Sequence, residues 1–273
     1  MKKIERSEPA SLDFAERLFT RGTDVFGPKE IQKVFGAVPA HIPNIPFTEQ
    51  ELVRARELDQ YLILQTDKTT GGKPLTMKSM HSQFDNKLGE GKLLYNTDWY
   101  GQKEVFYTTD VSRFSWRLTS REVISSSTSQ NYIGRTQAIV NYLQDQVYKG
   151  EELPHEYRLA VEEFKNKKSN LEELLNSDWQ KCAAECVGLR INQLFCERPV
   201  EVLYGLVVQH QINGEYLLRG RWTWTSVLSS VGFVVAVGSC GPGGVRVVSG
   251  DPRDSFSDLG VRFSRSAVTG LES

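Results

Sequence analysis

Four cysteines are among the side chains with the clearest potential for chemistry. Two of them are spaced so that their thiols could act together. Cys182 and Cys186 lie four residues apart in a helical pattern, so they could share one helix face as a redox pair or as metal ligands. No CxxC motif and no cluster of histidines accompanies them, and zinc sites depend on such clusters. We therefore expect Cys182, Cys186, Cys196 and Cys240 to be free thiols packed in or near the core.

Acid and base side chains occur in the same part of the chain. Glu162, Glu163, His155 and His210 could transfer protons, but no GxSxG, HExxH or cysteine–histidine signature surrounds them. A GGK tripeptide lacks the spacing of a phosphate-binding loop and is followed directly by Pro74. The sequence therefore predicts no catalytic residues, no metal and no cofactor, so that the chain is not expected to be an enzyme.

Composition narrows the class of partner. The net charge of -1 over 273 residues argues against nucleic acid or an anionic membrane surface as an electrostatic partner. The longest apolar runs, such as Val231 to Val237, are far below the roughly 20 residues that cross a bilayer. The start MKKIERSEPASLDF has no apolar run behind its basic residues, which predicts a cytoplasmic protein as synthesised, with display at a cell or virus surface left open.

Local patterns predict the elements that carry these residues. Residues 1–46 are rich in Gly and Pro and favour an extended N-terminal arm. The capping box Thr48-x-x-Glu51 predicts the start of a helix, and the aromatic and β-branched runs from Leu93 to Ile124 predict two or three short strands. Residues 128–212 show four helical patterns and form a predicted helical segment.

The composition changes abruptly in the tail. Residues 227–258 contain no Lys, Glu, Gln, Met or Trp, although these five types make up 59 of the 273 residues, so about seven would be expected by chance. They are also the types that cannot arise when the two adenines of an Asn codon ending in a pyrimidine are randomised. A Gly- and Val-rich β region tends to lack Lys and Glu as well. The absence of these five residue types is nevertheless consistent with adenine-directed mutagenesis of an Asn-rich template.

Within and around residues 227–258, a set of residues that we call the frame forms a recognisable pattern. It consists of Trp222-Thr-Trp-Thr-Ser226, Ser229-Ser230-x-Gly232, Val237-Gly238, Gly244-Val245-x-Val247, Pro252, Ser255 and the closing LGVRFSRS from Leu259 to Ser266. With the upstream strings FGAVPAHIPNIPFTEQEL, STSQNYIGRTQ and RPVEVLYGLVVQHQ, this frame resembles the variable proteins of diversity-generating retroelements. The resemblance is closest to the versions found in archaea, reduced-genome bacteria and viruses, and it covers most of the chain.

The resemblance implies an α+β, C-type-lectin-like fold with a helical insertion and an extended N-terminal arm. Residues 1–273 would form a single domain, with residues 222–266 as the variable ligand-binding region. In that region the period of two along a strand predicts that Val245 and Val247 pack inward, and that Arg246 and Val248 face the other way.

Fitting the family's frame assigns the variable, ligand-binding role to 14 positions with no common chemical theme. They are Val227, Leu228, Val231, Phe233, Ala236, Ser239, Cys240, Gly241, Arg246, Val248, Ser249, Asp251, Arg253 and Phe256. Any one of the apolar members could instead be ordinary core. As a set they predict an exposed apolar surface with arginines, which favours a protein ligand bound by a monomer or small homo-oligomer.

Two other classes of function stay open at this point. The tail could be a fixed β-rich surface of a structural or oligomeric protein. An enzyme of the formylglycine-generating type shares the broad fold, but it needs a cysteine pair, and only Cys240 falls in the tail. Calcium-dependent sugar binding is disfavoured, because the EPN, QPD and WND triplets of such lectins are absent.

Overall fold

The computed structural model describes residues 8–36, 38, 41–85 and 91–266, and within them it shows an α+β protein with two mixed four-stranded sheets. The first sheet has the order β1-β2-β3-β8, formed by Val25–Phe26, Gln60–Gln65, Ser115–Val123 and Arg262–Ser266. The second has the order β6-β5-β4-β7, formed by Gly244–Gly250, Val234–Gly241, Trp222–Leu228 and Leu259–Gly260. The second sheet therefore contains most of the predicted variable region.

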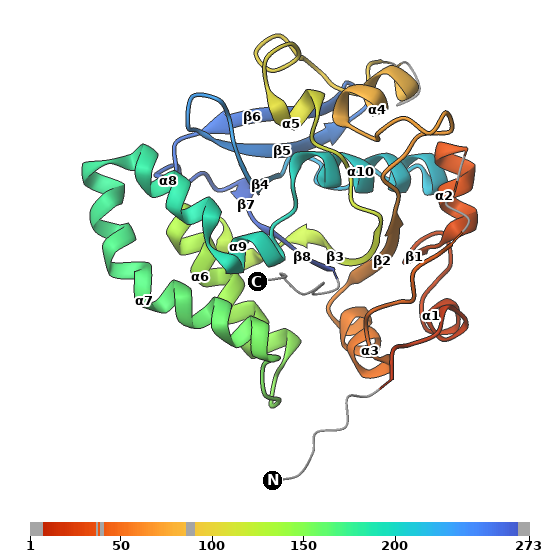
Figure 1. Cartoon of the computed structure of the whole chain (residues 1–273), viewed down its shortest axis with the longest axis horizontal. Coiled ribbons are helices and arrows are strands. Elements are labelled where there is room, and N and C mark those ends of the chain that lie inside the picture. The colour runs from red at the N-terminus through yellow and green to blue at the C-terminus, as the bar shows by residue number, and fades with distance from the viewer. Residues whose placement is uncertain (1–7, 37, 39–40, 86–90, 267–273) are drawn as a thin grey trace.

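Helices flank both sheets. Figure 1 shows α6 to α9 gathered on one side of the molecule and α1 to α3 on the opposite side. The α-helices span Leu12–Leu18 (α1), Pro28–Phe35 (α2), Glu49–Glu57 (α3), Met77–Phe84 (α4), Val105–Thr108 (α5), Tyr132–Tyr142 (α6), His155–Ser177 (α7), Trp179–Gly188 (α8), Arg190–Phe195 (α9) and Pro199–Asn213 (α10). A 3-10 turn, η1 (Ser125–Ser127), precedes α6, and a π-helical turn, η2 (Leu143–Val147), extends it.

The buried apolar side chains form two clusters that share the second sheet. The first core joins the N-terminal elements, β2 and α10, and the second core joins α6 to α9 with β7 and β8. Along β5 the side chains alternate, so that Val235 and Val237 enter the first core while Val234 and Ala236 enter the second. Both faces of β5 are thus covered, which explains its unbroken apolar run.

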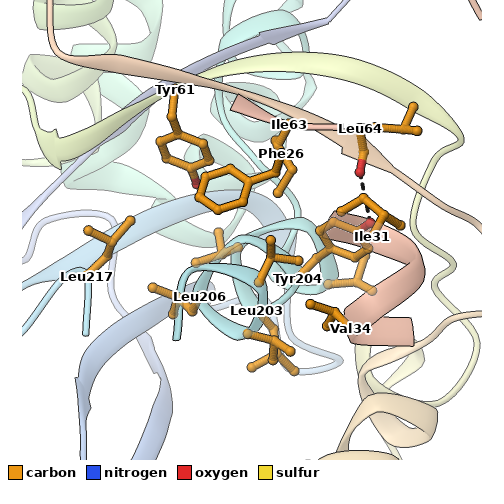
Figure 2. Packing of buried hydrophobic residues seen from close by; sticks show 14 of the residues in the cluster. Phe26, Ile31, Val34, Tyr61, Ile63, Leu64, Leu203, Tyr204, Leu206 and Leu217 are labelled. Carbon is orange, nitrogen blue, oxygen red and sulfur yellow. Dashed lines mark hydrogen bonds between the residues drawn. The ribbon is translucent and has the colours of Figure 1, made fainter. Parts of the chain in front are cut away.

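Helix α10 lies at the centre of the first core. Figure 2 shows Leu203, Tyr204 and Leu206 of this helix packed against Phe26 and Tyr61 from the neighbouring strands. The hydroxyl of Tyr204 donates a 2.9 Å hydrogen bond to the carbonyl of Leu64, so its one polar atom is satisfied inside the apolar cluster. A helix that carries apolar residues on all sides must be buried, and residues 199–209 of α10 are.

Several sequence-based expectations are confirmed. Thr48 and Glu51 form the predicted capping box at the start of α3. The helical segment contains α6 to α10, and Pro199 occupies the first turn of α10. All four cysteines are free and buried. Among the described residues no helix is long and apolar enough to cross a membrane.

Two expectations about elements were wrong. The extended arm at 1–46 instead contains α1, β1 and α2 within its described part, because Ser11 caps α1 and Pro28 opens α2 while Glu30 binds the amide of Gly27. Residues 1–7, 37 and 39–40 of that arm, including the start judged for a signal sequence, lie outside the described residues. The run VFYT, expected as a strand, forms the short helix α5, and β3 is the one named strand between Leu93 and Ile124.

Candidate functional site

Strand β6 presents one face to the core and the other to the surface. Val245 and Val247 are buried in the first core, which confirms the predicted alternation. Arg246 is exposed and Val248 is 39% exposed. Residues directly opposed in antiparallel strands share a face, so Val248, opposite Ala236, lies on the side of the sheet that carries the second core.

The loop between β4 and β5 displays Val231 at its tip. The amide of Ser229 donates to the carbonyl of Phe233 and the amide of Gly232 donates to that of Ser229, which closes a tight turn. Gly232 has φ of +88°, a conformation that favours glycine. Val231 is 61% exposed. The frame residues thus fix the turn while the side chain at its tip remains free.

Residues outside the tail hold this turn in place. The buried carboxylate of Glu104 accepts hydrogen bonds from the amide of Ser230 at 2.9 Å and from its hydroxyl at 2.7 Å. On the other side, the side-chain amide of Gln180 donates to the carbonyl of Val231 at 3.2 Å. Both contacts reach frame or backbone atoms, so neither depends on which side chain stands at position 231.

The loop after β6 is held in the same manner by the start of α6 and the residues before it. The amide of Ser129 donates to the carbonyl of Phe256 and the amide of Tyr132 donates to that of Pro252. The buried guanidinium of Arg135 donates to the carbonyls of Asp254 and Leu259. Burial lowers the pKa of Arg135 to about 10, so it remains charged at neutral pH.

Trp179, the first residue of α8, joins the two loops. Its ring stacks on Phe233 with centroids 4.8 Å apart, and the guanidinium of Arg253 lies 5.9 Å from its centroid. Arg253 also binds the carboxylate of Asp251 through two of its nitrogens. Predicted positions from the two loops therefore meet at one residue that the sequence did not single out.

Two exposed aromatic side chains border β6 on the edge away from β5, where Leu94 forms a parallel bridge with Val245. The guanidinium of Arg246 lies over the ring of Tyr95 at 4.4 Å, and the indole nitrogen of Trp99 donates to the carbonyl of Val247 at 3.2 Å. Tyr95 is 55% exposed and Trp99 is 40% exposed. Neither was predicted, and the only sequence signal was the presence of large aromatic residues in a polar loop.

The structure corrects two of the 14 predicted positions. Ala236 is fully buried in the second core and Cys240 is buried in the first, so neither side chain can contact a ligand. Ala236 is enclosed because β5 is an inner strand covered on both faces. Burial also raises the pKa of the Cys240 thiol to about 12, which leaves it protonated and unreactive.

The other twelve positions are at least partly exposed, but they do not form one uniform patch. Val227 and Leu228 are half-buried against the first and second core, respectively. Ser239 and Gly241 lie toward the β5–β6 turn, at the opposite end of the hairpin from Val231. The remaining eight belong to the β4–β5 loop, the later part of β6 and the loop that follows it; they are Val231, Phe233, Arg246, Val248, Ser249, Asp251, Arg253 and Phe256.

The titratable residues of the helical segment do not assemble into a site. Glu163 binds Lys167 and the amide of Arg190, and its pKa is lowered by these hydrogen bonds despite partial burial. His155 lies next to Arg158, whereas His210 packs on Tyr216. Among the described residues no group of three or more His, Cys, Asp or Glu side chains is placed to hold a metal ion.

The paired thiols are equally enclosed. The sulfurs of Cys182 and Cys186 lie 3.8 Å apart on one face of α8, as their spacing predicted. The hydrogen bond between the two thiols and burial both raise the pKa of Cys186, whereas the same hydrogen bond lowers the pKa of Cys182. Burial raises the pKa of Cys196. Thiolates are the reactive form, but all four sulfurs lie in buried residues, which keeps reagents away from Cys182 as well.

Comparison with known proteins assigns neither a family nor a specific fold to this chain. The chain matches no protein-family model, no curated protein and no solved structure closely enough to show a shared family or fold.

Proposed function

We propose that this chain is a non-catalytic ligand-binding protein whose C-terminal surface is diversified by a retroelement through adenine-directed mutagenesis of Asn codons. One observation carries the proposal. Residues outside the tail contact the loops that bear the exposed positions mainly through backbone carbonyls, as Gln180 does at Val231 and Ser129 at Phe256. Backbone contacts survive when a side chain changes, which is the property that a diversified surface requires.

The frame residues add a second line of support. Gly238 is one of them, and a Cβ atom there would lie 2.2 Å from the carbonyl oxygen of Arg221, so no larger residue fits. Arg262 of the closing LGVRFSRS binds Glu197 at 2.6 Å inside the protein, and Arg265 binds Glu51 at 2.6 Å. These frame residues are therefore fixed by packing and ion pairs, while Val231, Val248 and Phe256 between frame members are exposed. We also propose that the α+β fold is C-type-lectin-like.

The chemistry of the exposed surface favours a protein ligand. Val231, Val248 and Phe256 are large apolar side chains that stand out from the surface, with Phe256 59% exposed. Exposed apolar residues close to arginine are typical of protein interfaces. The aromatic rings of Tyr95 and Trp99 extend this surface beyond the diversified tail. We propose that they supply contacts that stay constant while the tail varies.

Replacing the exposed positions as a group tests the structural basis of the proposal. We expect a variant with Asn at Val231, Phe233, Arg246, Val248 and Phe256 to retain its far-UV circular dichroism and a cooperative unfolding transition. A control with Asn at Val245 and Val247 should unfold, because those side chains are core. Unfolding of the first variant would show that the five side chains hold the fold together.

The diversification itself is tested by sequencing the locus across a population. We expect differences concentrated at the twelve exposed positions, a neighbouring reverse transcriptase gene, and a near-repeat of the tail's coding sequence that differs where the template has adenine. A locus without a reverse transcriptase, without a repeat and with an unvaried tail would contradict the proposal. Light scattering coupled to chromatography separates a monomeric binder from a self-associating structural protein.

A further inference from the structure

A cleft lies outside the candidate ligand surface, where the two cores meet. It is a cleft of about 560 Å³ between the ends of β2 and β3 on one side and α6 with η2 on the other. Asp59, Ser120 and Glu122 line the first wall, and Tyr142 and Asp145 line the second. Clefts of roughly 300–1,000 Å³ at the junction of two packed units are typical places for small ligands.

The rim of this cleft is acidic. The carboxylates of Glu122 and Asp145 have no ion-pair partner within 4.0 Å among the described residues. Arg121 is the cationic residue in the lining, and it already binds Asp24, Asp59 and Glu215. Its charge is therefore neutralised by neighbouring carboxylates, and the cleft as a whole favours a positively charged occupant.

One lining residue of the cleft and one residue beside it, outside the lining, carry oxygen atoms that lack hydrogen-bond partners. Ser120 is 7% exposed, lines the cleft, and its hydroxyl has no partner. Gln60 lies opposite Ser120 in the β2–β3 register and is 2% exposed. Its amide nitrogen donates to the hydroxyl of Tyr142 at 3.4 Å, whereas its carbonyl oxygen is also unpartnered. An unsatisfied buried polar group destabilises the folded protein, so such atoms are usually paired by a ligand or water.

We propose that this cleft binds a small organic cation that carries several N–H donors, such as a primary amine or a guanidinium. Carboxylates at the rim would neutralise its charge, and the hydroxyl oxygen of Ser120 would accept one of its hydrogens. A metal ion fits poorly, since no three His, Cys, Asp or Glu side chains of the described residues converge here. The cleft shares no lining residue with the candidate ligand surface, so this proposal stands independently of the proposed function.

Calorimetric titration of the full chain with agmatine and putrescine tests the proposal. We expect saturable binding by at least one of them, weakened about tenfold by Asp145→Asn and by Ser120→Ala, since each removes one contact worth roughly 1.4 kcal/mol. Asp145 is exposed, so its substitution should leave folding unchanged. Asp98→Asn, at an exposed acid outside the cleft, is the matched control and should bind as the unmodified protein does.

Tetramethylammonium separates a built site from general charge attraction, because it carries a positive charge without N–H donors. We expect it to bind more weakly than either amine. The proposal is overturned if neither amine binds, if tetramethylammonium binds as well as they do, or if all three variants titrate alike. None of these results would bear on the diversified surface.

Discussion

Buried ion pairs fix several segments that lie far apart in the chain. The carboxylate of Glu201 in α10 contacts Arg117 of β3 at 3.4 Å and Arg198 at 2.9 Å, with Arg113 at 3.9 Å. Burial raises the pKa of Glu201, but the charges of these arginines and a hydrogen bond from the amide of Arg198 outweigh it and lower the pKa to about 2. The group is therefore ionised in the folded protein at neutral pH.

We expect Glu201→Gln to lower the free energy of unfolding by about 3–5 kcal/mol near neutral pH, since it leaves the buried guanidinium of Arg117 without its carboxylate. A carboxyl group with a lowered pKa in the folded state stabilises above its unfolded pKa and loses that effect on acidification. The difference between the two proteins should thus shrink as the pH falls from about 4.5 toward about 2.

Urea titrations over this pH range measure the effect. Glu152→Gln, at an exposed glutamate, serves as the control and should change stability little at any pH. A pH-independent difference between Glu201→Gln and the unmodified protein would show that the carboxylate charge is not the stabilising feature.

In the β5–β6 hairpin, β5 belongs to the buried scaffold, whereas β6 also carries exposed side chains. β5 is an inner strand covered on both faces, whereas β6 is covered on one face and carries Arg246 and Val248 on the other. The neighbours Val247 and Val248 are the same residue type in one strand, yet one is buried and the other is 39% exposed. They provide a matched pair for testing the division.

We expect Val247→Asn to lower the free energy of unfolding by about 2–5 kcal/mol, because it removes buried apolar contacts and buries an amide. Val248→Asn should change it by about 0.5 kcal/mol or less, as is usual at an exposed site. Chemical denaturation of the two single variants compares them directly. Equal losses would place Val248 in the core and remove β6 from the candidate surface.

In the molecule as a whole, the second sheet contributes side chains to both apolar cores. Trp224 and Val234 belong to the second core, while Val235 and Val237 of the same sheet belong to the first. Loss of either core would therefore expose one face of the shared strands. Such a connection favours a single cooperative unit rather than a helical domain attached to a β domain.

We accordingly expect far-UV circular dichroism and tryptophan fluorescence to report the same urea midpoint. The first signal is dominated by helices, many of them in α6 to α10, and the second includes Trp116 of the first core and Trp224 of the second. Two separated transitions would mean that the helical segment folds as an independent domain.

Features that depend on nearby residues could be predicted from the amino-acid sequence alone. Capping residues, helical periodicity and first-turn prolines predicted α3 and four helical patterns in 128–212, although one of these patterns is divided into α8 and α9 at Leu189. The period of two predicted the faces of Val245 to Val248. The same local signals failed in the arm, where the Gly-Pro pair that opens α2 was taken as extended chain. At VFYT the sequence could not distinguish a strand from a helix, because a short aromatic run occurs in both.

Which side chains reach the surface together depends on the three-dimensional arrangement of distant segments. The run Val234 to Val237 does not reveal that both faces of its strand are covered, so Ala236 was wrongly assigned to the surface. Trp99 contacts Val247 across 148 residues of sequence, and Glu104 reaches Ser230 across 126. Such contacts arise from how strands and loops assemble in space, and local propensity carries no information about which distant segment becomes a neighbour.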